Sequence, residues 1–387
     1  MTLSPDEAVA LALKENANLA AASARIEAAE GLRLQAGLKP NPRLIIQTEN
    51  ARIAGNTPFQ YGQDTDNFGY VSQVFESGGK RERRLDLAGA NVHANQLSLE
   101  AQRAQLAGRV LNAYWNAVGA QHLTKMLSES LAVLERTVQY HRDRVKEGLL
   151  PEADLIRVQL EYDQVAISYR NAEQEAKRSV LTLFREIGAP PEPNVSLTGD
   201  LAAAAPVPPV EIDQAVERRP DVKSAGQAVQ QAQAAVRLQK ANAKPDPEVL
   251  MGYKRTQGFN TLIAGVQLNL PVRNKNQGAI AAANAEETSA AAALQATRMA
   301  ARTEIQTLQS DYDQKRQLVE KSLPAMRAQA DETRRIADAV YRQGASDLLR
   351  LLDAERARIQ TETLYIRSVL EYRLAAVNLQ IALGLLP

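Results

Sequence analysis

Residues 32–48, LRLQAGLKPNPRLIIQT, and residues 236–254, VRLQKANAKPDPEVLMGYK, follow one plan, and this plan decides the fold. Each stretch has an apolar residue followed by Arg-Leu-Gln, then a Pro-x-Pro, then a short run of β-like residues. A second β-like run follows in each case, over Phe68–Phe75 and Thr261–Leu270. A pattern that recurs at a long interval indicates internal duplication.

Glycines keep the two copies in register. A long helical run starts near Arg81 in the first copy and near Gly278 in the second, and each is expected to be interrupted once, by glycine. The interrupting glycines, Gly148 and Gly344, are 196 residues apart, and so are the glycines that close the copies, Gly188 and Gly384. We therefore predict a mainly α chain with a small β part, built from a duplicated unit of helix, strand pair and long-helix hairpin.

The domain organisation follows from the duplication. The first structural repeat is expected over residues 1–189, with its strand pair at about 43–76. The second is expected over residues 210–387, with its strand pair at about 248–271. Residues 190–209 are rich in proline, which cannot continue a helix, so this stretch is predicted to connect the repeats.

The long helices carry a coiled-coil period. In the first copy, steps of four and three residues join an almost wholly apolar seam: Leu106, Val110, Ala113, Ala117, Ala120, Thr124, Leu127, Leu131, Leu134, Val138, His141 and Val145. In the second copy the seam is looser: Ile305, Leu308, Tyr312, Val319, Met326, Ala330 and Ala337. No proline lies between Arg81 and Leu150, so the first helix would be roughly 100 Å long. Such a length suits a structure that spans a distance.

Composition excludes several classes of protein. The 46 Lys and Arg residues balance 45 Asp and Glu, so the general field expected of a nucleic-acid binder is missing. Cysteine is absent, and the three histidines, His93, His122 and His141, are too widely spaced along one helix to share a metal ion. Nucleophile motifs and phosphate loops are missing too, so we expect no enzyme, no cofactor and no metal site. His141, on the seam, is expected to be a packed polar residue.

The membrane signals are mixed. No run of apolar residues is long enough for a transmembrane helix, and the first residues lack the pattern of a signal peptide. The predicted strands alternate, however: Leu262, Ala264, Val266 and Leu268 would share an apolar face. Such strands could cross a bilayer when tilted, but four of them cannot close a barrel, whose minimum is about eight. A membrane location would require several copies of the chain, whereas soluble hairpins capping a helical bundle would not.

Local signatures add a family resemblance. VSQVFESGGKR at residues 71–81 resembles the segment of TolC-like outer-membrane efflux proteins in which a strand passes into the long helix. Tyr341-Arg342-Gln343-Gly344, followed by Leu351-Leu352-Asp353-Ala354, resembles the helix–turn–helix tip of that family. The resemblance covers nearly the whole chain and is closest to the heavy-metal, CzcC-like branch.

The resemblance implies a homotrimer in the outer membrane of a Gram-negative bacterium. Three chains would form one 12-stranded β-barrel in contact with outer-membrane lipid, continued by an α-helical barrel through the periplasm. The assembly would be the passive exit duct of a tripartite efflux pump for small molecules or metal ions. Its expected partners are a periplasmic adaptor and an inner-membrane transporter of the RND type, and no nucleic acid. The alternatives are the duct of a type I protein-secretion system and a coiled-coil scaffold without a pore.

The resemblance also suggests gate residues. Asp154 matches an acidic gate position, Tyr341 a gate tyrosine, and Asp353 an aspartate of an acidic constriction. Two positions depart from the family pattern, because Ser346 stands where a gate arginine is usual and Arg350 replaces the second constriction acid. An arginine beside an aspartate partly cancels the field that would select cations.

The glycine turns are the second candidate site. Gly148 with Leu149, and Gly344 with Ala345, would form the periplasmic tips of the two helical hairpins. Glycine allows the tight reversal between helices. In the family these tips contact the adaptor, so the same role is implied here.

Overall fold

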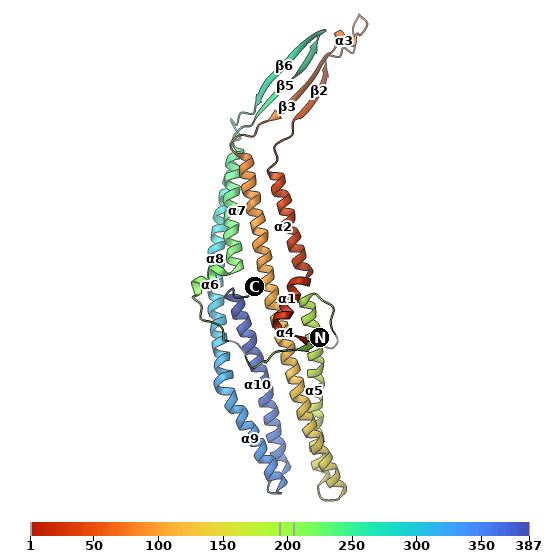
Figure 1. Cartoon of the computed structure of the whole chain (residues 1–387), viewed down its shortest axis with the longest axis vertical. Coiled ribbons are helices and arrows are strands. Elements are labelled where there is room, and N and C mark those ends of the chain that lie inside the picture. The colour runs from red at the N-terminus through yellow and green to blue at the C-terminus, as the bar shows by residue number, and fades with distance from the viewer. Residues whose placement is uncertain (1, 193–194, 204–205, 387) are drawn as a thin grey trace. The chain divides into compact units, whose positions relative to one another are not determined.

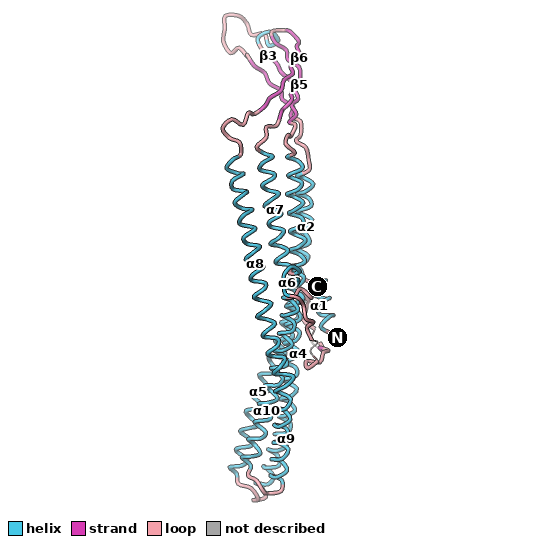
Figure 2. Tube along the Cα trace, turned by 90° about the vertical axis from the view of Figure 1, so that its left-hand side faces the viewer, coloured by secondary structure: helices cyan, strands magenta, loops and turns pink. Residues whose placement is uncertain are grey.

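The computed structural model describes residues 2–192, 195–203 and 206–386, and the elements fall in the order expected of a duplicated chain (Figures 1 and 2). The first copy consists of β1 (Thr2–Leu3), α1 (Pro5–Glu15), α2 (Ala17–Ala36), β2 (Arg43–Glu49), α3 (Tyr61–Asp64), β3 (Asp66–Val74), α4 (Lys80–Lys146) and α5 (Glu152–Ile187). The connector contains β4 (Ser196–Leu197). The second copy consists of α6 (Ile212–Arg218), α7 (Pro220–Asn242), β5 (Pro247–Thr256), β6 (Phe259–Leu268), α8 (Gln277–Gln317), the π-helical turn η1 (Leu318–Ser322), α9 (Leu323–Arg342) and α10 (Leu348–Ala382).

Contacts divide the chain into two compact units that do not coincide with the two repeats. The first unit joins the residues up to Ala21 with Leu99–Pro220 and the residues from Arg298 onward. The second unit joins Ala22–Ser98 with Asp221–Thr297. Each unit therefore takes segments from both copies. The repeat boundaries at 189 and 210 remain predictions, and the connector predicted at 190–209 lies partly outside the described residues.

The second unit contains a four-stranded antiparallel sheet in the order β2-β3-β5-β6. The register aligns Leu44 with Val71, Val71 with Met251 and Met251 with Ala264. Directly paired residues project from the same face, so this face carries the side chains expected from the alternation in sequence. Its large apolar members are all exposed: Leu44, Ile46, Val71, Val249, Met251, Tyr253, Leu262, Val266 and Leu268.

The opposite face of the same sheet is mixed, because one row across it holds Ile45, Tyr70 and Ile263 while its other rows carry polar residues. The polar residues include Gln47, Lys254 and Thr261, and nearer the helices Glu248 and Gln267. A sheet face on which all the large apolar side chains are exposed marks a surface that contacts lipid or another protein. Among the described residues, no helix is both long enough and apolar enough to cross a membrane.

A junction between the copies joins the sheet to the helices. Lys80, the first residue of α4, donates from Nζ to Asp246 Oδ2 at 2.6 Å and to the Lys244 carbonyl at 2.7 Å. The backbone N–H of Ser77 donates to Asp246 Oδ1 at 2.8 Å. Lys80 is buried, with 8 % of its surface exposed, so its charge needs this partner. The ESGGK sequence of the first copy therefore holds the Pro-x-Pro of the second.

Glycine is required in this junction for two reasons. Gly78 and Gly79 both have left-handed backbones, with φ of +68° and +72°. A Cβ on Gly78 would also lie 2.5 Å from Cδ of Lys244, whereas one on Gly79 would meet only Glu82 Oε2, at 3.6 Å. A side chain at either position would therefore strain the left-handed backbone, but only a side chain at Gly78 would also clash with Lys244.

We predict that Gly78→Ala destabilises the protein more than Gly79→Ala does. Each substitution costs about 1–2 kcal/mol for the left-handed backbone, and Gly78→Ala additionally pushes Lys244 aside. Thermal unfolding of both variants in detergent measures the difference. Equal losses of stability would show that the close approach of Lys244 has no energetic weight.

We also predict that the junction weakens in acid. Asp246 lies just before β5; burial alone would raise its pKa, but the hydrogen bonds from Lys80 and Ser77 outweigh burial and lower it. A carboxyl whose pKa is lower in the folded than in the unfolded protein stabilises the fold. This contribution is complete above the unfolded pKa of about 3.9 and is lost as the pH falls through the lower pKa of the folded state.

Thermal unfolding between about pH 7 and pH 3 tests this dependence, with Asp246→Asn as the comparison. The variant should be less stable than the wild type at neutral pH, and the gap should narrow in acid. A constant gap across this range would contradict the assignment.

The predicted seam of α4 forms the core of the first unit. Leu106, Val110, Leu134 and Val138 are buried, and His141 is fully so. A second buried stripe of α4 faces α10 and uses small residues: a Cβ on Gly108 would lie 2.4 Å from Cδ1 of Ile381. The long helix is therefore packed on two sides in this unit.

The second long helix departs from the prediction. The run expected to continue unbroken from Gly278 to Gly344 changes to a π-turn over Leu318–Ser322, in which the Leu323 N–H donates to the Leu318 carbonyl. Pro324 explains the break, because proline has no N–H to offer and its ring crowds the preceding turn. The extra residue also shifts the seam, so that Leu323 is 2 % exposed and the expected Met326 is 44 % exposed.

Candidate functional site: the hairpin tips

The first hairpin turns at Gly148, between α4 and α5. Gly148 has φ +70°, and a Cβ there would meet nothing within 4 Å, so glycine is needed for its backbone and not for space. The N–H groups of Gly148 and Leu149 donate to the carbonyls of Val145 and Arg144. This pair of bonds ends α4 in a Schellman motif and leaves the Leu149 side chain 59 % exposed.

The second hairpin repeats this geometry at Gly344, between α9 and α10. Gly344 has φ +71° and equally open surroundings. The N–H groups of Gly344 and Ala345 donate to the carbonyls of Tyr341 and Val340. The four predicted tip residues thus occupy equivalent places in two exposed turns.

Behind the turns lies a small core shared by the two hairpins. It consists of Val138 of α4, Val158 of α5, and Leu348 and Leu352 of α10. Tyr341, from the last turn of α9, packs against this core together with Leu155 and Tyr162. All four helices of the two hairpins therefore meet here.

Tyr341 is held by a residue that the sequence did not single out as functional. Its hydroxyl lies 2.8 Å from Nε2 of His141, and Nδ1 of His141 lies 2.8 Å from the Thr137 carbonyl one turn earlier in α4. The two rings stack, with centroids 6.0 Å apart. Burial raises the pKa of Tyr341, and the charges of Tyr140 and Asp154 raise it further, so the hydroxyl keeps its proton near neutrality.

The predicted gate residues are only partly brought together. Asp154 lies close enough to Tyr341 to act on its pKa. Asp353 is exposed and pairs at 3.5 Å with Arg356, three residues further along α10. Arg350 is exposed, and its backbone N–H donates to Oδ1 of Asp347, the N-cap of α10, at 3.0 Å. The arginine that the structure pairs with Asp353 is therefore Arg356 and not Arg350.

Sequence reasoning also missed a buried ionic cluster above the tips. Glu355 of α10, only 5 % exposed, accepts from Nε of Arg334 at 2.9 Å and from Nη2 of Arg358 at 2.8 Å. Arg358 also donates to Ser130 of α4 at 2.9 Å. Three helices are thus joined through one carboxylate. The spacing of Glu355 and Arg358 was visible in the sequence, but such pairs are common on exposed helix faces.

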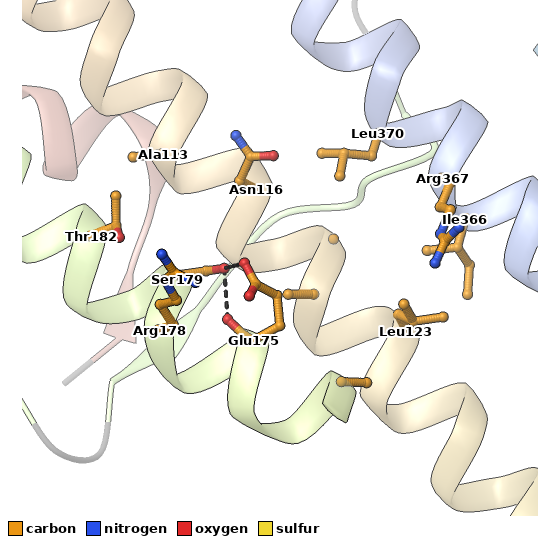
Figure 3. A pocket seen from close by; sticks show the side chains of 13 residues that line it. Ala113, Asn116, Leu123, Glu175, Arg178, Ser179, Thr182, Ile366, Arg367 and Leu370 are labelled. Carbon is orange, nitrogen blue, oxygen red and sulfur yellow. Dashed lines mark hydrogen bonds between the residues drawn. The ribbon is translucent and has the colours of Figure 1, made fainter. Parts of the chain in front are cut away.

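A groove of 410 Å³ runs between α4, α5 and α10 in the same unit (Figure 3). Its polar lining includes Glu175, Arg178 and Arg367. Ser179 is not activated as a nucleophile, because its hydroxyl donates to the Glu175 carbonyl at 2.8 Å, within its own helix. In the part of the chain that the structure describes, no cluster of three or more His, Asp or Glu side chains is suited to hold a metal ion.

The chain combines a sheet that has one exposed apolar face with paired helical hairpins that end in exposed turns. This combination is typical of a membrane channel subunit. Comparison with known proteins agrees. The family model described as outer membrane efflux protein matches residues 8–189 and 212–385. The chain belongs to this family, whose members are efflux channels of the outer membrane.

Individual relatives match this chain over most of its length. The cobalt-zinc-cadmium resistance protein CzcC of Cupriavidus metallidurans is 23% identical over 99% of this chain and 90% of its own length. The probable efflux pump outer membrane protein TtgC of Pseudomonas putida is 25% identical over 83% of this chain and 71% of its own length. The crystal structure of VceC from Vibrio cholerae superposes with a TM-score of 0.79 at 19% identity, covering 98% of this chain and 96% of that one. The predicted family, fold class and outer-membrane location are confirmed.

Proposed function

We propose that this chain forms, with two further copies of itself, the passive and non-catalytic exit duct of a tripartite efflux pump. The observation that carries the proposal is the sheet, whose apolar face is exposed and whose edge strands, β2 and β6, each pair on one side only within the described chain. Unpaired backbone groups are not tolerated at an edge that faces lipid.

The strand directions allow copies to complete one another. All three pairings in the sheet are antiparallel, so β2 and β6 run in opposite directions. The free edge of β6 in one copy can therefore pair antiparallel with the free edge of β2 in the next. Such a head-to-tail contact generates a ring when the rotation between neighbouring copies closes, as the proposed duct requires. Membrane barrels need about eight strands or more, and three copies supply 12.

The helices offer a second surface for assembly. Large apolar side chains form a stripe along the exposed side of α5, at spacings that are multiples of a heptad or one turn: Ile156, Leu160, Ile167 and Leu181. An exposed stripe with coiled-coil spacing is a contact surface for another helix. Neighbouring copies in a helical barrel would cover it.

The tips and the substrate complete the proposal. The exposed turns at Gly148–Leu149 and Gly344–Ala345 would contact a periplasmic adaptor, which links the duct to an inner-membrane transporter of the RND type. Tyr341, Asp154, Asp353 and Arg350 would line or hold the closed entrance. The near-complete coverage of a cobalt-zinc-cadmium resistance protein favours divalent metal ions as cargo.

We predict that the full chain, extracted in detergent, has the mass of three copies. Multi-angle light scattering with correction for bound detergent, or native mass spectrometry, measures this directly. A monomer that stays soluble without detergent would contradict the duct. An assembly of two or four copies would leave a closed barrel possible but would remove the trimer.

We predict that Asp353→Ala raises the single-channel conductance or leak in planar bilayers, because it removes a carboxylate from the proposed constriction and releases Arg356 from its ion pair. Asp353→Asn, which preserves the size of the side chain, is the control that separates charge from bulk. Unchanged conductance in both variants would remove Asp353 from the constriction.

A further inference from the structure

We infer that His141 is a positioning residue of the entrance gate: by accepting a hydrogen bond from Tyr341, it ties the second helical hairpin to the first and holds the tips closed. This inference rests on the proposed duct function and adds to it a residue outside the expected gate. It concerns the hydrogen bond between α4 and α9, within one copy of the chain.

The geometry fixes the proton positions on the His141 ring. The ring is fully buried, at 0 % exposure, and each nitrogen has one partner. The Thr137 carbonyl can only accept, so Nδ1 carries a proton and donates to it. In the neutral ring, Nε2 is then the acceptor, and the Tyr341 hydroxyl is the donor. One histidine orientation thus serves both helices.

The groups around this bond keep Tyr341 a donor. The Tyr140 ring packs edge-on against His141, with centroids 5.4 Å apart, and Arg144 lies over Tyr140. Asp154, from α5, adds negative charge near Tyr341, and Val158 and Leu348 fill the apolar side of the cluster. Burial and negative surroundings both favour the protonated tyrosine. The Tyr341 hydroxyl is therefore kept available as a donor to His141.

The position of this bond makes it a latch between hairpins. Within its own hairpin, α9 is bound to α10 by the ion pair of Arg334 with Glu355 and by the paired hydrogen bonds of Arg327 with Glu362. The hydrogen bond from Tyr341 to His141 crosses instead to the other hairpin. If α9 and α10 move outward together, their mutual contacts survive, whereas this cross-link must break.

Two further links cross between the hairpins. Arg358 of α10 donates to the buried Ser130 of α4 at 2.9 Å, one helix segment further from the tips, and a more exposed ion pair joins α10 to α5. Arg356 of α10 pairs with Glu161 of α5, but the arginine side chain is 47% exposed. Exposed ion pairs are screened by water and salt and contribute little. Breaking the bond of the buried His141 would instead leave a polar group without a partner in an apolar cluster, which is costly. The histidine link is therefore a stronger restraint than the Arg356–Glu161 pair, and His141 lies nearer to the turn at Gly148 than Ser130 does.

The latch is also connected to the exposed turn. The carbonyl of Tyr341 accepts the N–H of Gly344, so the residue that bonds His141 also forms part of the second tip. A partner that displaces this tip would pull directly on the hydrogen bond. Tyr341 would thus link closure of the entrance to contact with the adaptor.

Four variants test the inference. His141→Leu and Tyr341→Phe each remove one side of the bond. His141→Asn retains a group that can reach Thr137 but is too short for Tyr341, whereas His141→Gln carries an acceptor at about the distance of Nε2. His122→Leu is the matched control, because His122 is an exposed histidine of the same helix.

The readouts are single-channel conductance of the purified full-length assembly and entry of a large hydrophilic antibiotic into cells that express it. We expect a severalfold rise in leak for His141→Leu, His141→Asn and Tyr341→Phe, wild-type behaviour for His122→Leu, and partial or full recovery for His141→Gln. The double variant His141→Leu/Tyr341→Phe should leak no more than either single variant. A purely structural histidine would instead lower thermal stability without this pattern.

Two results would overturn the inference. Wild-type leak in both His141→Leu and Tyr341→Phe would show that the bond restrains nothing. Leak in Tyr341→Phe alone would leave the tyrosine in the gate and remove the histidine. Should His141→Leu fail to assemble, Tyr341→Phe, which loses one hydroxyl, and His141→Gln still decide the question. If the wild-type protein forms no pore at all, the proposed duct itself falls, an outcome distinct from a pore with unaltered leak.

Discussion

Backbone hydrogen bonding at the edges of a small sheet is the constraint on which the rest of this structure depends. Four strands with one apolar, exposed face suit a lipid environment, but β2 and β6 each have a side that the described chain leaves unpaired. Hydrocarbon offers no water to satisfy such groups. In the proposed duct, neighbouring copies of the chain would pair these edges and cover the exposed stripe of α5.

The two repeats of the chain differ in structure at corresponding positions. In the first repeat, the strand-to-helix passage contains Gly78, which lies against Lys244, and the buried Lys80, which bonds Asp246 of the second repeat. In the second copy, the corresponding long helix contains a π-turn before Pro324. The hairpin turns, by contrast, have remained alike, down to the hydrogen bonds that close them. The two turns thus keep one geometry, whereas the strand-to-helix passages and the long helices of the two repeats differ.

Local and periodic features were predictable from the sequence. The α4 seam, the alternation along β6 and the glycine turns all follow from spacings of a few residues, and the structure reproduces them. The π-turn was not predicted, because the apolar period of the second long helix was extended through Pro324. The partner of Tyr341 was missed because His141 is 200 residues away, and its place on the seam suggested only packing. Periodicity tells that a side chain is buried, but it does not tell which distant polar group meets it.

The connector and the amino-terminal strand have a consequence for how the polypeptide matures. Strands β1 and β4 pair in parallel, and the hydroxyl of Tyr114 lies within hydrogen-bonding distance of the carbonyls of Leu3 and Thr198. Arg373, near the carboxyl end, stacks on Trp115 and donates to the Asp200 carbonyl. This unit cannot be completed until almost the entire chain has emerged, since its contacts join residues hundreds of positions apart. Until these distant contacts form, the apolar segments of the chain stay exposed and are prone to aggregation.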